Sequence, residues 1–362
     1  MVYQILRKAL FQMDPETAHN RTVQALKCMQ SIPWLKKLIA SRMIVEDSRL
    51  ASEVWGLTFP NPIGLAAGFD KDAEVYPGLA ALGFGFVEVG TLTPRPQNGN
   101  PLPRIFRLPG DEAIINRMGF NNHGVASAKQ MFEKLEQPSI PIGINLGKNK
   151  DTPNEKAAED YILGLSELYP YGDYFVINVS SPNTKGLRDL QHVEALEQLL
   201  TRILHQRDQS AQNHQQKKPM LLKIAPDLEP QAAGDIVSAA MEAGIDGIIA
   251  TNTTLSREGL SSEHRHETGG LSGKPLREQS TRFIRHLYSI TRGKIPLIGV
   301  GGIFSGKDAM EKFKAGANLV QVYTGMIYRG PAIVRKMNQE LLEWMEKEKV
   351  NHFQEWIGQD LH

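Results

Sequence analysis

Eight short apolar runs alternate with longer amphipathic segments from residue 62 onwards, and this alternation restricts the fold more than any other feature. The runs cover residues 62–67, 86–91, 140–145, 174–178, 220–225, 245–251, 296–300 and 319–323. Helix-like stretches lie between them, for example 193–206 and 231–243, and the polar residues 206–218 predict a surface linker between a helix and a strand. Near-continuous apolar strands separated by helices are typical of a parallel sheet, whose strands are buried on both faces. Eight such units favour a (β/α)8 TIM barrel, an α/β fold, over a doubly wound sheet.

The length, charge and cysteine content of the chain set further bounds. Its 362 residues exceed the roughly 250 of a typical barrel, so we expect additions to the barrel. A formal net charge of +1 gives no general attraction to nucleic acid, and we expect no such partner. Cys28 is the single cysteine, so no disulfide framework and no metal site are predicted. No run of about 18 apolar residues predicts a membrane-spanning helix.

The first 45 residues differ from the rest in charge and pattern. They carry seven basic and two acidic residues, a net charge of +5. Asp14 and Pro15 predict the start of a helix, and apolar residues at helical spacing precede them. Such basic helices either lie in a membrane interface or dock on the barrel with their basic face in water. We predict three parts: a helical segment (1–45), a barrel (46–345) and a C-terminal tail (346–362).

Polar residues or glycines end almost every apolar run. They include Lys71, Thr91, Asn145, Asn178, Lys223, Thr251, Asn252, Gly301 and Gly302. In a barrel the C-terminal ends of the strands form one rim, and that rim carries the active site. We therefore expect these groups to converge on a functional site.

The fourth run ends in the most polar of these segments, residues 178–184 (NVSSPNT). Asn178 and Asn183 each offer a donor and an acceptor to a planar polar ligand. Ser180, Ser181 and Thr184 add hydroxyl groups that can move a proton. A turn after a strand has a similar composition, so both interpretations stand on this segment alone.

Two further features suggest the kind of ligand. Residues 299–303 (GVGGI) and Gly325 lie at the ends of the last two runs, where barrels often bind the phosphate of a sugar phosphate or of FMN. Lys223 lies inside an apolar strand, where it is costly to bury without a partner. It is a candidate for a Schiff base, for the cation beside a reduced flavin, or for a structural ion pair.

The chain resembles the class 2 (quinone-dependent) dihydroorotate dehydrogenases, FMN enzymes of pyrimidine biosynthesis. The matching stretches are 64–71 (GLAAGFDK), 89–96 (VGTLTPRP), 115–122 (INRMGFNN), 143–150 (GINLGKNK), 178–183 (NVSSPN), 223–227 (KIAPD), 250–254 (ATNTT), 269–273 (GGLSG) and 298–303 (IGVGGI). They follow one another in order over most of the chain. Residues 7–12 and Asp14-Pro15 are similar to the family's membrane-associating extension.

The resemblance implies roles for individual residues. It implies FMN binding by Ala67, Gly68, Phe69, Asp70, Lys71, Thr91, Asn145, Asn178, Lys223, Thr251, Gly273, Gly302, Tyr323 and Thr324. It implies dihydroorotate or orotate binding by Lys71, Asn116, Arg117, Met118, Gly119, Phe120, Asn178, Asn183, Asn252 and Thr253. A flat anionic ring needs amide donors and acceptors and a cation for its carboxylate, so the residue types suit the ligand.

The resemblance also implies a mechanism. Ser181 is the expected base that removes the C5 proton of dihydroorotate while a hydride leaves C6 for FMN. Thr184 and water are expected to relay that proton along a path shaped by Phe120. A membrane quinone then reoxidises the flavin near His19, Arg107 and Tyr323. Without the resemblance, His19 is a surface helix residue and Arg107 a member of a structural ion pair.

The implied location is the cytoplasmic side of the inner membrane, as a peripheral protein bound through the N-terminal helices, with no obligatory protein partner. Class 1 relatives carry cysteine where this chain has Ser181, and they lack the extension, so both features favour a quinone. Two other classes stay open on residues alone. One is a barrel lyase or isomerase that uses Lys223 as a Schiff base, and the other is a membrane-docked binding module without activity.

Overall fold

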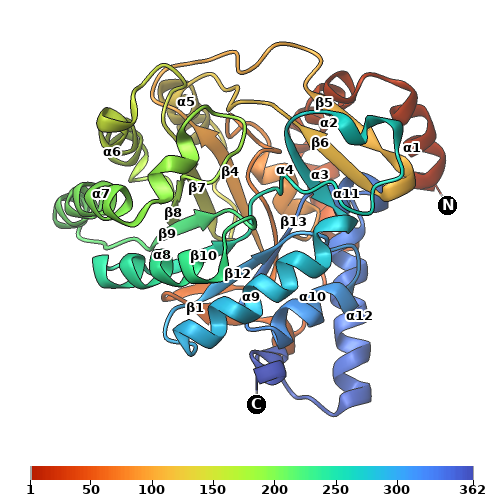
Figure 1. Cartoon of the computed structure of the whole chain (residues 1–362). Helices are drawn as coiled ribbons and strands as arrows, with labels where there is room; N and C mark the ends of the chain where they lie inside the picture. The colour runs from red at the N-terminus through yellow and green to blue at the C-terminus, as the bar shows by residue number, and fades with distance from the viewer. Residues whose placement is uncertain (1, 362) are drawn as a thin grey trace.

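The computed structural model describes residues 2–361 and contains a closed barrel of eight parallel strands. The barrel strands are β3 (Ile63–Leu65), β4 (Phe86–Leu92), β7 (Ile142–Leu146), β8 (Tyr174–Asn178), β9 (Met220–Ile224), β10 (Gly247–Ala250), β12 (Leu297–Val300) and β13 (Leu319–Val322). Each lies within or overlaps one of the eight predicted runs. The (β/α)8 TIM barrel is therefore confirmed (Figure 1).

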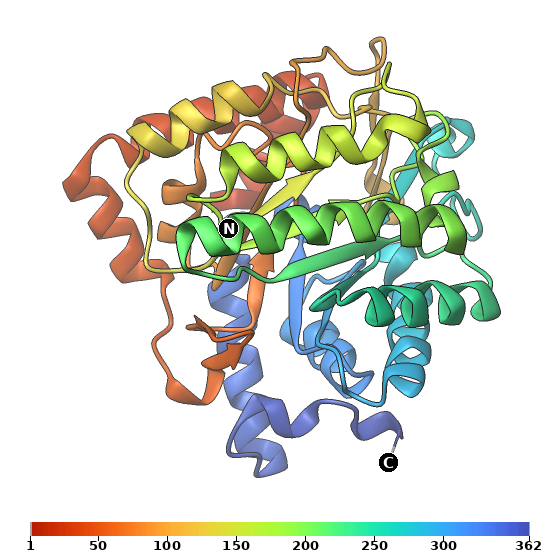
Figure 2. The same ribbon diagram turned by 90° about the vertical axis from the view of Figure 1, so that its left-hand side faces the viewer.

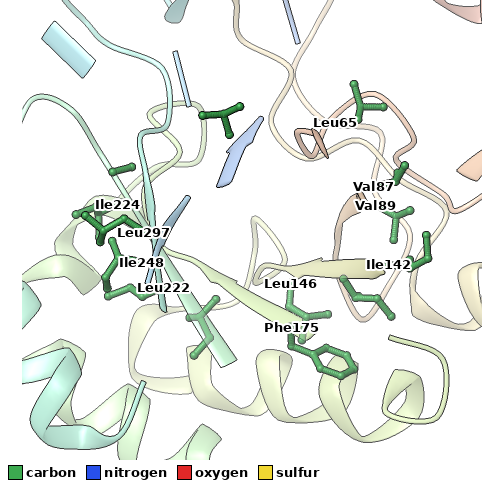
Figure 3. Close-up of a cluster of buried hydrophobic side chains, with 14 of the residues drawn as sticks. Leu65, Val87, Val89, Ile142, Leu146, Phe175, Leu222, Ile224, Ile248 and Leu297 are labelled. Carbon is green, nitrogen blue, oxygen red and sulfur yellow. The ribbon is translucent and has the colours of Figure 1, made fainter. Parts of the chain in front are cut away.

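Helices surround the barrel on its outside. They are α4 (Tyr76–Ala81), α5 (Val125–Lys134), α6 (Ala157–Leu168), α7 (Val193–His214), α8 (Pro230–Ala243), α9 (Arg277–Thr291), α10 (Gly306–Lys314), α11 (Thr324–Arg329) and α12 (Ile333–Glu348). Every second strand residue points outward and joins the core beneath them. Figure 3 labels such side chains, including Val87 and Val89 of β4 and Leu222 and Ile224 of β9.

One expectation about this outer layer was wrong. The polar composition of residues 206–218 predicted a surface linker, but α7 continues to His214. The cause lies on the buried face of the helix, where Arg207 and Ser210 continue the line of Leu200 and Leu204. Arg207 also binds Asp246 at 3.0 Å, so a charged residue packs where an apolar one would be expected.

The barrel interior near the N-terminal ends of the strands is apolar and tightly packed. Inward residues such as Phe86, Tyr174 and Leu221 form a second buried cluster, separate from the outer core. Gly64 and Gly143 make room for two of these rings. A Cβ on Gly64 would lie 2.4 Å from the Phe86 ring, and one on Gly143 would lie 2.1 Å from that of Tyr174. The hairpin of β1 (Ser52–Val54) and β2 (Leu57–Phe59) packs Val54 and Phe59 against this cluster.

A separate antiparallel sheet was not predicted. It consists of β5 (Ile105–Leu108), β6 (Ala113–Asn116) and β11 (Gly270–Gly273), with β6 in the middle. The pairing of Asn116 with Gly270 joins segments about 150 residues apart in the chain. It holds Asn116 beside the loop that follows β10, because Thr254 also pairs with Leu271.

The N-terminal helices are α1 (Val2–Gln12), α2 (Pro15–Gln30) and α3 (Pro33–Met43). The predicted N-cap is confirmed, since the Asp14 side chain accepts a hydrogen bond from Thr17 N at 2.9 Å. Figure 1 shows α1 at the same end of the barrel as β5 and β6, and Figure 2 shows the red N-terminal helices continuing down one side of the barrel. The helix α2 is docked through buried residues that include Leu26 and Met29, whereas Trp34 of α3 is 67% exposed. No helix among residues 2–361 is both long and apolar enough to cross a membrane.

Candidate active site

A cavity of about 620 Å³ lies between the C-terminal ends of the barrel strands and the helices α1 and α2. Its walls fall into two regions that we name by their chemistry. The polar half is formed by rim residues that include Lys71, Thr91, Asn178, Ser181, Lys223 and Asn252. The apolar half is formed by side chains of the N-terminal helices, including Leu6, Leu10, Phe11, Ala18, Leu26 and Met29.

Most of the residues singled out in the sequence line this one cavity. They are His19, Ala67, Gly68, Phe69, Lys71, Thr91, Arg107, Asn116, Met118, Gly119, Phe120, Asn178, Ser181, Asn183, Lys223, Thr251, Asn252, Thr253, Gly273, Gly302, Tyr323 and Thr324. Five others, Asp70, Arg117, Asn145, Ser180 and Thr184, are not among the lining residues. The structure therefore brings together residues that are up to about 300 positions apart in the chain.

Asp70, Arg117 and Thr184, which do not line the cavity, have different surroundings. Asp70 is buried and accepts hydrogen bonds from Glu74 N at 2.7 Å and Val75 N at 2.9 Å, and burial raises its pKa to about 6. Arg117 points towards the loop after β10, where it binds Glu267 at 2.6 Å. Thr184 is buried, and its hydroxyl has no hydrogen-bond partner among the described residues.

Amide side chains form a connected network beneath the polar half. Asn178 Nδ2 donates to Thr91 Oγ1 at 3.0 Å and to Asn145 Oδ1 at 3.1 Å. Its Oδ1 accepts from the hydroxyl of Ser180 at 3.2 Å. Asn145 does not line the cavity itself, but it is hydrogen-bonded to Thr91 and Asn178, which do. Because all these groups are buried and bonded, their orientation is fixed before any ligand enters.

Ser181 lies at the edge of this network. Its Oγ accepts from Asn183 N at 3.3 Å, which leaves the hydroxyl hydrogen free to point into the cavity. The Asn183 side chain donates to Asn116 Oδ1 at 3.2 Å, so the loop after β8 is tied to β6. Phe120 lies on the same wall with a φ of +55°, a conformation uncommon for a bulky residue.

Lys71 and His19 meet where the two halves join. Lys71 Nζ lies 3.3 Å from His19 Nε2. Burial lowers the pKa of Lys71 to about 8, and the Glu16 carboxylate partly offsets this. Burial and the neighbouring Lys71 charge lower the pKa of His19 to about 3. His19 is therefore neutral at physiological pH, and its Nε2 accepts from the Lys71 ammonium, which leaves its proton on Nδ1.

The other two residues expected near the quinone anchor the same region. Arg107 donates to the carbonyls of Phe11 and Met13 at 3.2 and 3.0 Å and stacks over the Phe11 ring, so it holds the end of α1. Tyr323 donates to the Gly68 carbonyl at 3.3 Å, and burial raises its pKa to about 12. Arg107 forms no side-chain ion pair among residues 2–361, so the alternative interpretation of Arg107 as a member of a structural ion pair was wrong.

The glycines of the rim suit a phosphate-bearing ligand. Gly302 has a φ of +71°, and a Cβ there would lie 2.4 Å from Arg277 Cα, so no side chain fits. Asp308 holds the adjoining turn by accepting from Phe304 N at 2.9 Å and from Arg277 at 2.8 Å. Together with the lysine and amides of the polar half, this bare backbone matches what FMN requires: close approach for a phosphate and polar groups for a ring.

Comparison with known proteins decides the family. The sequence pattern described as dihydroorotate dehydrogenase matches residues 49–345. The chain belongs to the dihydroorotate dehydrogenase family. Curated members include the dihydroorotate dehydrogenase (quinone) of Christiangramia forsetii, which is 51% identical over 95% of this chain and 99% of its own length. That of Gloeobacter violaceus is 50% identical over 99% of this chain and 98% of its own.

Solved structures of the family agree in fold. The ligand-free DHODH of Eimeria tenella is 43% identical with a TM-score of 0.87, covering 96% of this chain and all of that one. The complex of Eimeria tenella DHODH with ferulenol is 41% identical with a TM-score of 0.86, and the alignment covers 96% of both chains.

Two residues of this dihydroorotate dehydrogenase family member were missed in the sequence. Glu88 and Gln321 are fully buried inside the barrel. Gln321 lines the cavity, and Glu88 lies beneath it. The sequence pattern could have identified them, because each is a polar residue in the middle of an apolar strand, as Lys223 is. The sequence does not show that these three strands place their polar residues together.

Proposed function

We propose that this protein is a quinone-dependent dihydroorotate dehydrogenase, which oxidises (S)-dihydroorotate to orotate with FMN and passes the electrons to a membrane quinone, in pyrimidine (UMP) biosynthesis. The observation that carries this proposal is the shared cavity. Ser181, the amide network and two lysines line its polar half, and an apolar half continues from it. Relatives about 50% identical carry that activity in their names.

FMN is the proposed cofactor, and when bound it supplies the two-electron acceptor that side chains lack. We assign its ring to the region of Ala67, Thr91 and Lys223, and its phosphate to the backbone of Gly302 and Gly273. Lys223 lines this region and would supply a fixed cation that favours negative charge on the ring. The Schiff-base alternative is less favoured, because Lys223 pairs with Glu88 at 3.6 Å and a Schiff base needs the neutral amine.

The substrate is assigned to the amide-rich wall. Asn116, Asn183 and Asn252 present fixed donors and acceptors to a flat ring, and the Lys71 ammonium meets its carboxylate. Ser181 Oγ takes the proton from C5. A serine hydroxyl is a weak base, so we assign Thr184, whose buried hydroxyl is unpartnered among the described residues, to the relay through water. Phe120 shields that path.

The apolar half is assigned to the quinone. His19 and Tyr323 lie between the two halves, so a quinone head group there would approach the proposed ring site. The exposed apolar side chains Ile5 and Trp34 lie on basic helices, which supports docking on an anionic membrane surface. Binding of the full chain to anionic vesicles, and loss of binding on deletion of residues 1–45, tests this part of the proposal.

The decisive experiment is an absorption spectrum of the purified protein followed by anaerobic addition of dihydroorotate. We expect a flavin band that bleaches on addition and returns when a quinone is supplied. A colourless protein would contradict the cofactor assignment. A flavin band that dihydroorotate leaves unchanged would contradict the substrate assignment.

A further inference from the structure

Glu88 is a fully buried carboxylate in the middle of β4, and the chemistry described so far does not use it. Its Oε1 accepts from Asn145 Nδ2 at 2.7 Å, and its Oε2 accepts from Gln321 Nε2 at 2.6 Å. Lys223 Nζ lies 3.6 Å from Oε1. Four strands thus supply one buried cluster. Because burying a carboxylate is costly without partners, such a cluster needs an explanation beyond packing.

The carboxylate fixes the direction of the hydrogen bonds above it. An ionised carboxylate only accepts, so Asn145 must turn its NH2 group towards Glu88. The Asn145 carbonyl oxygen then faces Thr91 and Asn178, and accepts from them at 2.5 and 3.1 Å. Asn178 has therefore used its NH2 group. Its own carbonyl oxygen is directed to the far side, where Ser180 and Asn252 donate to it.

Glu88 also sets the charge beneath the cavity. Lys223 lines the cavity and is the cation that we assign to the proposed flavin ring. A negative charge 3.6 Å from its ammonium offsets much of that positive charge, and the low dielectric of the interior strengthens the effect. Without Glu88, the same lysine would favour a reduced, anionic flavin more strongly.

We propose that Glu88 is a positioning residue for the proposed site: it orients the amide chain from Asn145 to Asn178 and moderates the charge of Lys223. The inference rests on the proposed flavin and orotate binding. It assigns Glu88 no contact with substrate or cofactor, because it acts through Asn145 and Lys223.

The test is the variant Glu88→Gln, which keeps the size of the side chain but removes its charge and its purely accepting character. We expect two changes in the purified flavoprotein. The flavin becomes easier to reduce by at least tenfold in its equilibrium constant, which is about 30 mV for a two-electron couple. The affinity for orotate, measured from the shift of the flavin absorption band, falls at least fivefold because the amides are no longer held in one direction.

The matched control is Asn338→Leu. Asn338 is also fully buried, on α12 outside the barrel, and its side-chain amide has no hydrogen-bond partner among the described residues. The control should leave both the flavin potential and the orotate affinity unchanged. If Glu88 only supported packing, Glu88→Gln would match this control in both readouts, and the inference would be overturned.

A second variant covers the case in which an unpaired lysine prevents folding. Glu88→Gln combined with Lys223→Met removes both charges, so the flavin potential should not rise above that of the wild type. Orotate affinity should still be lower than in Lys223→Met alone, because Asn145 is no longer held in one direction. A potential raised by about 30 mV in the double variant, or an orotate affinity equal to that of Lys223→Met, would overturn the inference. Wild-type protein that binds no flavin would instead contradict the proposed function, so the two failures are distinguishable.

Discussion

The polar and apolar halves of the cavity differ in the kind of contact that they offer a ligand. In the polar half, donors and acceptors are bonded to one another across several strands, so each side chain has one orientation. In the apolar half, contacts come from helices and include flexible side chains such as Leu10 and Met29. Directional bonds discriminate strongly between ligands, whereas apolar contacts discriminate by size alone. The polar half is therefore suited to a single substrate, and the apolar half to a range of hydrophobic tails.

The largest expected effect concerns a single hydroxyl of the polar half. Ser181→Ala should keep the flavin but slow its reduction by dihydroorotate by about 10²–10⁴, the usual contribution of a positioned base. Stopped-flow measurement of flavin bleaching gives the rate. Ser180→Ala is the matched control, because Ser180 bonds Asn178 and Asn252 and should affect orotate affinity more than rate. A normal bleaching rate in Ser181→Ala would remove Ser181 as the base.

A smaller effect is expected from filling the apolar half. Ala18 is buried on α2 and lines the cavity, so Ala18→Phe should obstruct it and slow quinone-linked turnover by roughly tenfold. Flavin reduction by dihydroorotate should change little, because the polar half is untouched. Ala9→Phe introduces the same ring on an exposed part of α1 that does not line the cavity, and should leave both rates unchanged. Equal loss of both rates in Ala18→Phe would show that the two halves are not functionally separate.

The smallest effect concerns the junction of the two halves and depends on pH. Lys71 has a pKa lowered to about 8, so its ammonium is present below that pH and lost above it. Affinity for the orotate carboxylate should therefore fall as pH rises, by about threefold between pH 7.5 and 8.5. Titrations of the flavin absorption band with orotate measure this. His19, with a pKa near 3, should contribute no change in this range, and His19→Gln should keep the same profile.

Local patterns in the sequence were enough to predict the barrel, because each strand is a short apolar run with a turn after it. The rim residues followed from the rule that barrel sites lie at the C-terminal ends of strands. The sheet of β5, β6 and β11 could not be predicted, since its strands have only four residues each and β11 joins the hairpin of β5 and β6 from a distant segment. The helical end of α7 was missed because Arg207 and Ser210 are polar yet buried.

The contacts within the site were less predictable than its membership. The resemblance placed Lys71 at the ligand, but no pattern showed that α2 would bring His19 within 3.3 Å of it. Glu88 was hidden among apolar neighbours, and its importance depends on Asn145 and Gln321, which come from other strands. Three-dimensional proximity of this kind depends on strand order and register, which single residues do not reveal.

The glycines inside the barrel have a consequence for how such a protein can be altered. Gly143 leaves the space that the Tyr174 ring occupies, and Gly64 does the same for Phe86. A larger residue at either glycine is tolerated only if the facing ring becomes smaller at the same time. Almost no single substitution at these packed positions beneath the site is therefore neutral. Changes there require paired exchanges, in which a glycine and its facing ring are replaced together.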